Sequence, residues 1–204
     1  MPLALFVAIL QVVATFVPAQ RSGGPLPPLP ANATGWTDAT FELSVDATGA
    51  VQDVMPIAVT PGSTAFIGPA LKKWTFQPAG DGTNPLPSRV LVVTVFRPPI
   101  LYNGPALGAP PNTVNPASPG VPLPLTRTSP QYPMSAIDDA IVLMEISIDT
   151  DGSVLAVAAQ AGSPPFSTLA VQAVRQWTFQ PAQRGGIPVK SKAYVIVGFA
   201  RPVT

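Results

Sequence analysis

The six residues Trp-Thr-Phe-Gln-Pro-Ala occur twice in this chain, at positions 74–79 and again at positions 177–182. The same offset of 103 residues aligns residues 41–99 with residues 144–202 without a gap, and about a third of the aligned positions are identical. Self-similarity at one fixed spacing indicates a repeated structural unit. We therefore predict two copies of one unit in tandem, which are too few for a solenoid.

The composition excludes several classes of function. Charged residues make up 10% of the 204 residues, and the formal net charge is +1 with no basic run, so we expect neither nucleic acid nor an anionic membrane surface as a partner. The absence of Cys and His removes thiol nucleophiles, disulfides and zinc sites of the usual kind. We expect no cofactor and no metal.

The N-terminal stretch has the composition of a secretory signal. Residues 3–17 are apolar except for Gln11 and Thr15, and they lead into Val17-Pro18-Ala19. This run would span about 22 Å as a helix, short of the ~30 Å hydrocarbon core. We therefore predict a signal peptide at residues 1–19, cleaved after Ala19. Since no Lys or Arg precedes the run, an uncleaved membrane anchor stays open as the alternative.

Proline-rich stretches mark the predicted boundaries. Pro at positions 25, 27, 28 and 30 favours extended polyproline conformations, which predicts a spacer at residues 20–34. The first domain then covers residues 35–99. Ten Pro in residues 97–130 predict a linker at residues 100–127 with no core of its own, followed by the second domain at residues 128–204.

Each unit is expected to open with a β-hairpin. Apolar and polar residues alternate in residues 41–46 and 144–149, which is typical of half-buried strands. Asp46 and Gly49, like Asp149 and Gly152, then supply a turn in which Gly adopts positive φ. We prefer this turn to a metal site at Asp46, Asp149 and Asp151, because so few carboxylates make too few ligands.

A helix is expected next in each unit. In the second unit, Ser167 or Thr168 can cap a helix that follows Pro164-Pro165. In the first unit, Gly68-Pro69 predicts a helix that is short or begins at Pro69.

The repeated hexapeptide is expected to end each helix rather than to carry chemistry. Its aromatic residues are predicted core anchors, and its proline forbids continuation of the helix. The structural residues assigned on this basis are Trp74, Phe76 and Pro78 in the first unit, and Trp177, Phe179 and Pro181 in the second. A final strand follows at residues 90–96 and 194–199.

These elements predict an α+β fold: two tandem β-β-α-β domains, each a three-stranded antiparallel sheet of order 2-1-3 with a helix on one face. The last strand would then lie at an edge, where its unpaired backbone groups can accept another chain.

The second unit resembles the C-terminal domain of TonB, the periplasmic energy transducer of Gram-negative bacteria. The resemblance rests on Pro130-Gln131-Tyr132-Pro133, on the hairpin at residues 148–154, on the hexapeptide, on Gly186-Ile187-Pro188-Val189, and on a strand that closes at Phe199. The first unit resembles a degenerate copy without the Tyr-Pro entry. A complete transducer also has a membrane anchor whose His engages an inner-membrane motor, and this chain has no His.

The resemblance implies a periplasmic protein that binds an N-terminal segment of outer-membrane transporters by strand addition. The residues that it implies for peptide binding are Gln131, Tyr132, Pro133, Tyr194, Val195, Ile196, Val197 and Phe199. For Tyr132-Pro133, a rigid turn at the start of the domain is the alternative to a place on the partner surface.

Two hypotheses follow. In the first, the protein is a binding module that recognises extended peptides, from an outer-membrane transporter or another envelope protein, through an edge strand. In the second, the domains pair with each other or form a homodimer and act as an envelope scaffold. An enzyme is not expected: Ser residues have no His partner, and a carboxylate pair drawn from Asp138, Asp139 and Glu145 has no supporting motif.

Overall fold

This computed structural model describes residues 16–29, 37–97 and 112–201. Its long strands are rich in Val, Ile and Leu. Such side chains suit a pleated, half-buried surface. The long strands are β2 (Thr37–Val45), β3 (Val51–Val59), β7 (Ser88–Arg97), β10 (Ala140–Ile148), β11 (Val154–Ala161) and β15 (Ser191–Phe199). The described residues contain two helices, α1 (Ser63–Leu71) and α2 (Phe166–Val174). The predicted α+β class is confirmed.

Short strands complete the described structure and form small two-stranded sheets beside the main one, except for β8, which joins the main sheet. They are β1 (Gln20–Gly23), β4 (Thr75–Gln77), β5 (Ala79–Gly80), β6 (Pro85–Leu86), β8 (Asn112–Thr113), β9 (Leu123–Thr126), β12 (Thr178–Gln180), β13 (Gln183–Arg184) and β14 (Ile187–Pro188).

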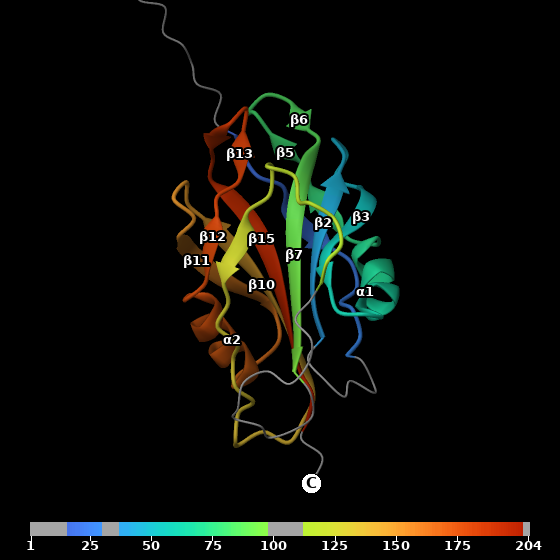
Figure 1. The fold of residues 1–204 in the computed structure, drawn as a ribbon, viewed down its shortest axis with the longest axis vertical. Coiled ribbons are helices and arrows are strands. Elements are labelled where there is room, and N and C mark those ends of the chain that lie inside the picture. The colour runs from blue at the N-terminus through green and yellow to red at the C-terminus, as the bar shows by residue number, and fades with distance from the viewer. Residues whose placement is uncertain (1–15, 30–36, 98–111, 202–204) are drawn as a thin grey trace, which may run out of the picture.

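The main sheet has seven strands in the order β11-β10-β15-β7-β2-β3-β8 and contains strands of both units. Within each unit the long strands are antiparallel, and the first strand lies between the second and the last. The units meet where β7 and β15 pair in parallel, in a register that runs from Leu91 opposite Ala193 to Arg97 opposite Phe199. Figure 1 shows these two strands side by side in the centre of the molecule. We call this pairing the seam.

The seam corrects the expectation of two separate three-stranded sheets, each with an exposed last strand. Both last strands lie inside one sheet. The physical reason is that the outer edges of β7 and β15 each carry unpaired backbone groups along an apolar strand, and pairing them satisfies both rows at once. The strand order within a unit could be argued from the sequence, but the neighbour beyond the last strand could not.

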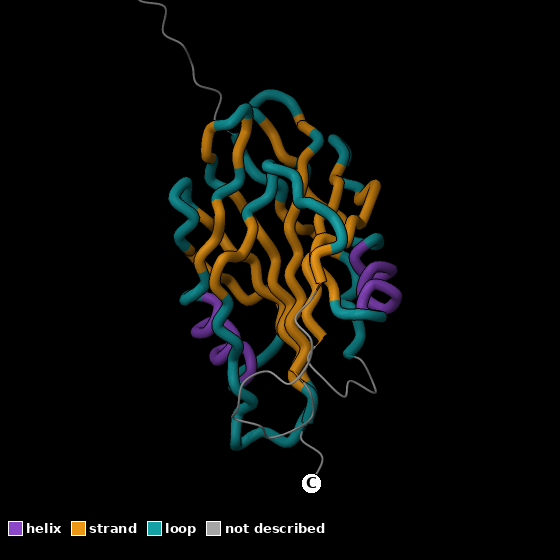
Figure 2. The backbone as a smooth tube through the Cα atoms, viewed as in Figure 1, coloured by secondary structure: helices purple, strands orange, loops and turns teal. Residues whose placement is uncertain are grey.

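Each face of the sheet carries a core that contains residues from both units. The core under α1 buries Trp74 and Phe76, and it also contains Leu143, Tyr194 and Ile196 of the second unit. The core under α2 buries Trp177 and Phe179, and the first unit contributes Leu91, Val93 and Val95 to it. Successive side chains of a strand point to opposite faces, so the seam strands supply both cores. Figure 2 shows the two helices outside the strands, on opposite sides.

Packing at the seam is close around Gly198, which lies opposite Phe96 in the register. A Cβ atom at this glycine would lie 2.1 Å from Cδ1 of Phe96 and 2.4 Å from Cδ2 of Leu29. No side chain fits in that space unless both neighbours move.

The segments upstream of each unit differ from the predicted spacer and linker. Strand β1 pairs with β4, and β9 pairs with β12, at the same offset of 103 residues. The indole Nε1 of Trp74 donates to the Pro25 carbonyl at 2.7 Å, and that of Trp177 donates to the Thr128 carbonyl at 2.8 Å. The polyproline-like segments are therefore part of the repeated unit. The matching positions of Pro27 and Pro130 carried this signal in the sequence.

Helix α1 is short, with nine residues, but it does not begin at Pro69. It begins at Ser63, after Gly62 with a φ of 84°, and contains Pro69 inside it. Pro69 lies near the end of the helix, where it removes one hydrogen bond and leaves the preceding turns intact.

Most of the predicted signal peptide lies outside the described residues, but its last four residues are described. Val17 exchanges two backbone hydrogen bonds with Gly80, at 2.9 and 3.0 Å, and Ala19 is buried. Cleavage after Ala19 would remove these contacts. Among the described residues, no helix has the length and apolarity that a membrane crossing requires.

Candidate functional site

Strand β15, the predicted peptide-binding strand, has neighbours on both sides. It pairs with β10 along its whole length and with β7 from Ala193 to Phe199. The side chains implied for peptide binding are fully buried; these are Tyr194, Val195, Ile196, Val197 and Phe199. The expectation that this strand forms a free edge is therefore wrong. An added strand would have to displace β7.

Tyr194 lies in a buried polar network between the units. Its hydroxyl donates to Oε2 of Glu145 at 2.8 Å and accepts the backbone N–H of Arg21 at 2.6 Å. Lys192 forms an ion pair with the other oxygen of Glu145 at 2.5 Å. Burial raises the pKa of Tyr194 above its ordinary value, so the hydroxyl keeps its proton and can donate. This network fixes the second unit to the N-terminal segment of the first.

The entry residues have mixed roles. Tyr132 packs edge-on against Phe166, with ring centroids 5.7 Å apart, and its hydroxyl donates to the Asp138 carbonyl at 2.9 Å. Pro133 is buried, whereas Gln131 is exposed. The ring centroids of Phe166 and Phe199 lie 5.1 Å apart. The entry and the last strand therefore meet through the buried ring of Phe166. Tyr132 and Pro133 thus brace the start of the unit.

A shallow open groove lies beside this entry. Its wall contains residues from the entry and from the start of α2; these are Pro133, Met134, Ser135, Pro164, Pro165, Thr168, Leu169 and Gln172. Met134 is 97% exposed. The groove is apolar and holds no cluster of titratable groups.

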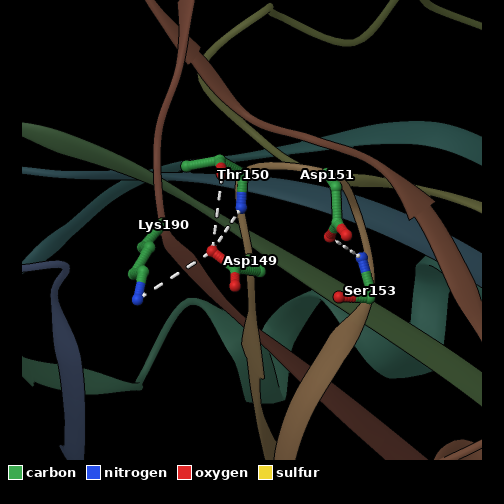
Figure 3. Close-up of polar contacts among 5 residues, drawn as sticks. All are labelled: Asp149, Thr150, Asp151, Ser153 and Lys190. Carbon is green, nitrogen blue, oxygen red and sulfur yellow. Dashed lines mark hydrogen bonds and ion pairs between the residues drawn. The ribbon is translucent and has the colours of Figure 1, made fainter.

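In the second hairpin turn, backbone N–H groups donate hydrogen bonds to the acidic side chains. Oδ1 of Asp149 accepts the N–H of Thr150 at 2.8 Å and lies 3.9 Å from Nζ of Lys190, and Oδ1 of Asp151 accepts the N–H of Ser153 at 2.8 Å (Figure 3). The hydrogen bonds from Ser153 lower the pKa of Asp151. No group of three or more metal-ligating side chains occurs among the described residues.

The turn glycines lie against the repeated hexapeptide. Gly49 and Gly152 adopt φ values of 89° and 86°, and a Cβ atom at either would lie 1.8 Å from the carbonyl oxygen of Phe76 or Phe179. The carbonyls of both glycines accept hydrogen bonds from the N–H groups of the same two residues. Each copy of the hexapeptide, with Pro78 in the first and Pro181 in the second, therefore packs across the end of the hairpin in its own unit. Its role there is structural.

The remaining acidic candidates have structural contacts. Oδ1 of Asp139 accepts the N–H of Arg201 at 2.5 Å, and Glu145 is buried in the network around Tyr194. Asp138 is exposed and contacts Tyr132 through its carbonyl.

One long strand outside the predicted peptide-binding residues lies at an edge of the main sheet. Strand β11 ends the sheet, with β10 as its single neighbour among the described strands. Its eight residues, Val-Leu-Ala-Val-Ala-Ala-Gln-Ala, contain no charge and no proline. This lack of protective residues was visible in the sequence.

Comparison with known families supports the resemblance predicted for the second unit. Residues 128–200 match the family described as Gram-negative bacterial TonB protein C-terminal. No curated protein matches the chain. The matched region starts at the carbonyl that binds Trp177 and ends after β15, so it coincides with the second unit. The predicted resemblance of the second unit to the TonB C-terminal domain is therefore confirmed over residues 128–200.

Proposed function

We propose that this protein is a periplasmic, TonB-like module that binds other envelope proteins by accepting an extended segment as an added strand, in association with outer-membrane transport. The observation that carries the proposal is the family match of residues 128–200. The family transduces energy through protein contacts, without enzymatic activity, and its domains interact with outer-membrane transporters. Strand addition suits a molecule built around one large sheet.

The described arrangement limits how the residues implied by the resemblance could take part. Strand β15 would become available only after β7 leaves it, whereas Gln131 is exposed in the present arrangement. Docking on β15 is thus a proposal for an opened form, in which the seam has separated.

The experiment is capture of the full chain on immobilised N-terminal segments of outer-membrane transporters, at concentrations well above micromolar. We expect capture together with altered backbone hydrogen exchange in one long strand. Faster exchange in β7 with continued protection of β15 would indicate the opened form. Absence of capture would rule out recognition of transporter segments.

A second candidate function is favoured by the seam itself. Because β7 and β15 occupy each other, the two units could form an envelope scaffold that has no transporter partner. Hydrogen exchange separates the candidates: a scaffold keeps β15 protected in the presence of every transporter segment. The tandem β-β-α-β organisation is common to both proposals.

A further inference from the structure

The second long strands of the two units, β3 and β11, carry different residues along the sides that face away from their hairpin partners. In the first unit, β3 contains Asp53 and Pro56, and Nζ of Lys72 donates to the Gln52 carbonyl. Charges and proline on an edge strand are recognised protections against pairing with other chains. In the second unit, the residues that correspond to Asp53 and Pro56 are Ala156 and Ala159.

An extended segment also covers the end of β3. Strand β8 pairs antiparallel with Ala58 and Val59, and the N–H of Val114 donates to the Ile57 carbonyl at 2.8 Å. The side-chain amide of Asn115 donates to the Pro56 carbonyl at 2.8 Å. The first unit therefore shows how an uncharged Asn-Thr-Val-Asn segment docks on this edge.

The same edge of the second unit is exposed. Strand β11 corresponds to β3 at the offset of 103 residues, and both strands share a bulge at the same place: Ala159 lies opposite Met144 as Pro56 lies opposite Phe41. Leu155 is 52% exposed, and Ala156, Ala158 and Ala159 are also exposed. No described strand lies beyond β11.

The backbone of Ala159 points toward this open side. Pro56 has no N–H to donate, and its carbonyl accepts from Asn115 on the β8 side, so the groups of this position face away from β2. Alternation in an antiparallel pair places the groups of Val157 on the same outer side. At least two residues of β11 thus present backbone donors and acceptors outward.

We propose that the outer edge of β11 is a docking site for an extended, uncharged segment of a partner protein, which pairs antiparallel with it as β8 pairs with β3. This inference rests on the proposed protein-binding function and names both the strand and the chemistry of the partner. Because the exposed residues of β11 are mostly Ala, main-chain hydrogen bonds supply the affinity. The partner segment is expected to carry small polar or β-branched side chains, like those of β8.

The first test appends a second copy of residues 102–117 after Thr204 of the full chain. This places a copy of β8 at the same distance from Phe199 as β8 itself has from Phe96. We expect slower hydrogen exchange of the backbone amides in residues 157–162. The matched control carries Val114→Pro in the appended copy alone, which removes the N–H that donates to the edge. Equal exchange rates in both chains would overturn the proposal.

The second test captures the full chain on N-terminal segments of outer-membrane transporters and compares wild type with Ala159→Pro. We expect the substitution to weaken capture about tenfold, since it removes an outward donor and blunts the edge. The Pro56 position shows that proline fits here without loss of a bond to the neighbouring strand. Leu155→Lys, which keeps every backbone donor, is the second variant and should weaken capture less.

The two tests separate the inference from the proposed function. Capture that Ala159→Pro leaves unchanged would overturn the β11 site and leave transporter recognition intact. Absence of capture in every chain, with protection by the appended copy, would refute transporter recognition and support the edge. A dimer that Ala159→Pro dissolves, without capture of any segment, would overturn the partner claim in favour of a second copy of this chain.

Discussion

The cores under α1 and α2 are built from corresponding strands but differ at one of the residues that cross the seam. In the core under α1 this residue is Tyr194, whose ring lies edge-on to Trp74 and Phe76 at 5.8 and 5.9 Å. The corresponding residue in the core under α2 is Leu91, which has no polar atom in its side chain. The seam is therefore symmetric in its backbone and asymmetric in its hydrogen bonds.

This difference changes how hydrogen bonds join the two units. The Tyr194 hydroxyl joins Glu145 of the second unit to Arg21 of the first, whose guanidinium lies 4.4 Å from the ring of Trp74. In the other direction the hydrogen bond is direct, because the N–H of Ser118 donates at 2.8 Å to Oε2 of Glu42, a buried residue of the first unit.

The largest expected effect tests whether the units unfold together. Trp74→Ala and Trp177→Ala should each destabilise the chain by about 3–5 kcal/mol, because each removes a buried ring and leaves a cavity. Since each core contains residues of both units, we expect a single transition in a denaturant titration followed by near-UV circular dichroism. Two separate transitions would contradict the shared cores.

The asymmetry at the seam is tested by Tyr194→Phe. The change should cost about 1–3 kcal/mol, because it leaves an oxygen of Glu145 and the N–H of Arg21 without the hydroxyl. The measurement is chemical denaturation. Tyr132→Phe is the matched control: its hydroxyl bonds an exposed carbonyl, and the cost should stay within about 0.5 kcal/mol. Equal costs for both variants would show that the buried network has no special role.

The two helices differ at Gly68, where the second unit has Val171. Gly68→Ala should stabilise the chain by roughly 0.5–1 kcal/mol, since the nearest atom to a new Cβ is 4.0 Å away. Thermal melting measures the gain. Gly62→Ala has free space as well, but a φ of 84°, so that control should be destabilised. A loss of stability in Gly68→Ala would show that α1 needs the glycine for packing.

The smallest effect concerns the first hairpin turn. Hydrogen bonds from Thr48 and from the N–H of Ala50 lower the pKa of Asp46 from 3.8 to about 2. Because the folded pKa is depressed, the contribution of this group to stability is present above pH 3.8 and is lost as the pH falls through about 2. A carbon-detected NMR titration measures the pKa directly, and Thr48→Ala should raise it. An unchanged pKa in that variant would refute the hydrogen bond as the cause.

The elements of each unit could be predicted because their signals are local. Alternation in residues 41–46, the positive φ of Gly49 and the burial of Trp74 follow from strand period, turn geometry and apolar surface. The seam depends on two strands about a hundred residues apart, and no local pattern encodes that pairing. For the same reason the prediction that β15 is a free docking edge is wrong: the resemblance implies this strand, but β7 occupies its edge.

The packed polyproline segments show a second kind of limit. Proline content alone favours a spacer, yet the carbonyls of Pro25 and Thr128 accept the two indole hydrogen bonds. These are long-range contacts of ordinary backbone groups, which composition does not reveal. The sequence does contain the correspondence between the two segments, because the offset of 103 residues also relates Pro27 to Pro130.

Because both seam strands belong to one chain, their pairing depends on protein concentration differently from a dimer contact. Two identical units related by a two-fold axis along their last strands would form the same contact as an isologous dimer, and its occupancy would then depend on protein concentration. Here one chain carries both halves, so closing the seam is a unimolecular step governed by an effective concentration that the connecting segment sets. Closure of the seam is therefore independent of protein concentration, and another chain that pairs with β7 or β15 must compete with a strand of the same molecule.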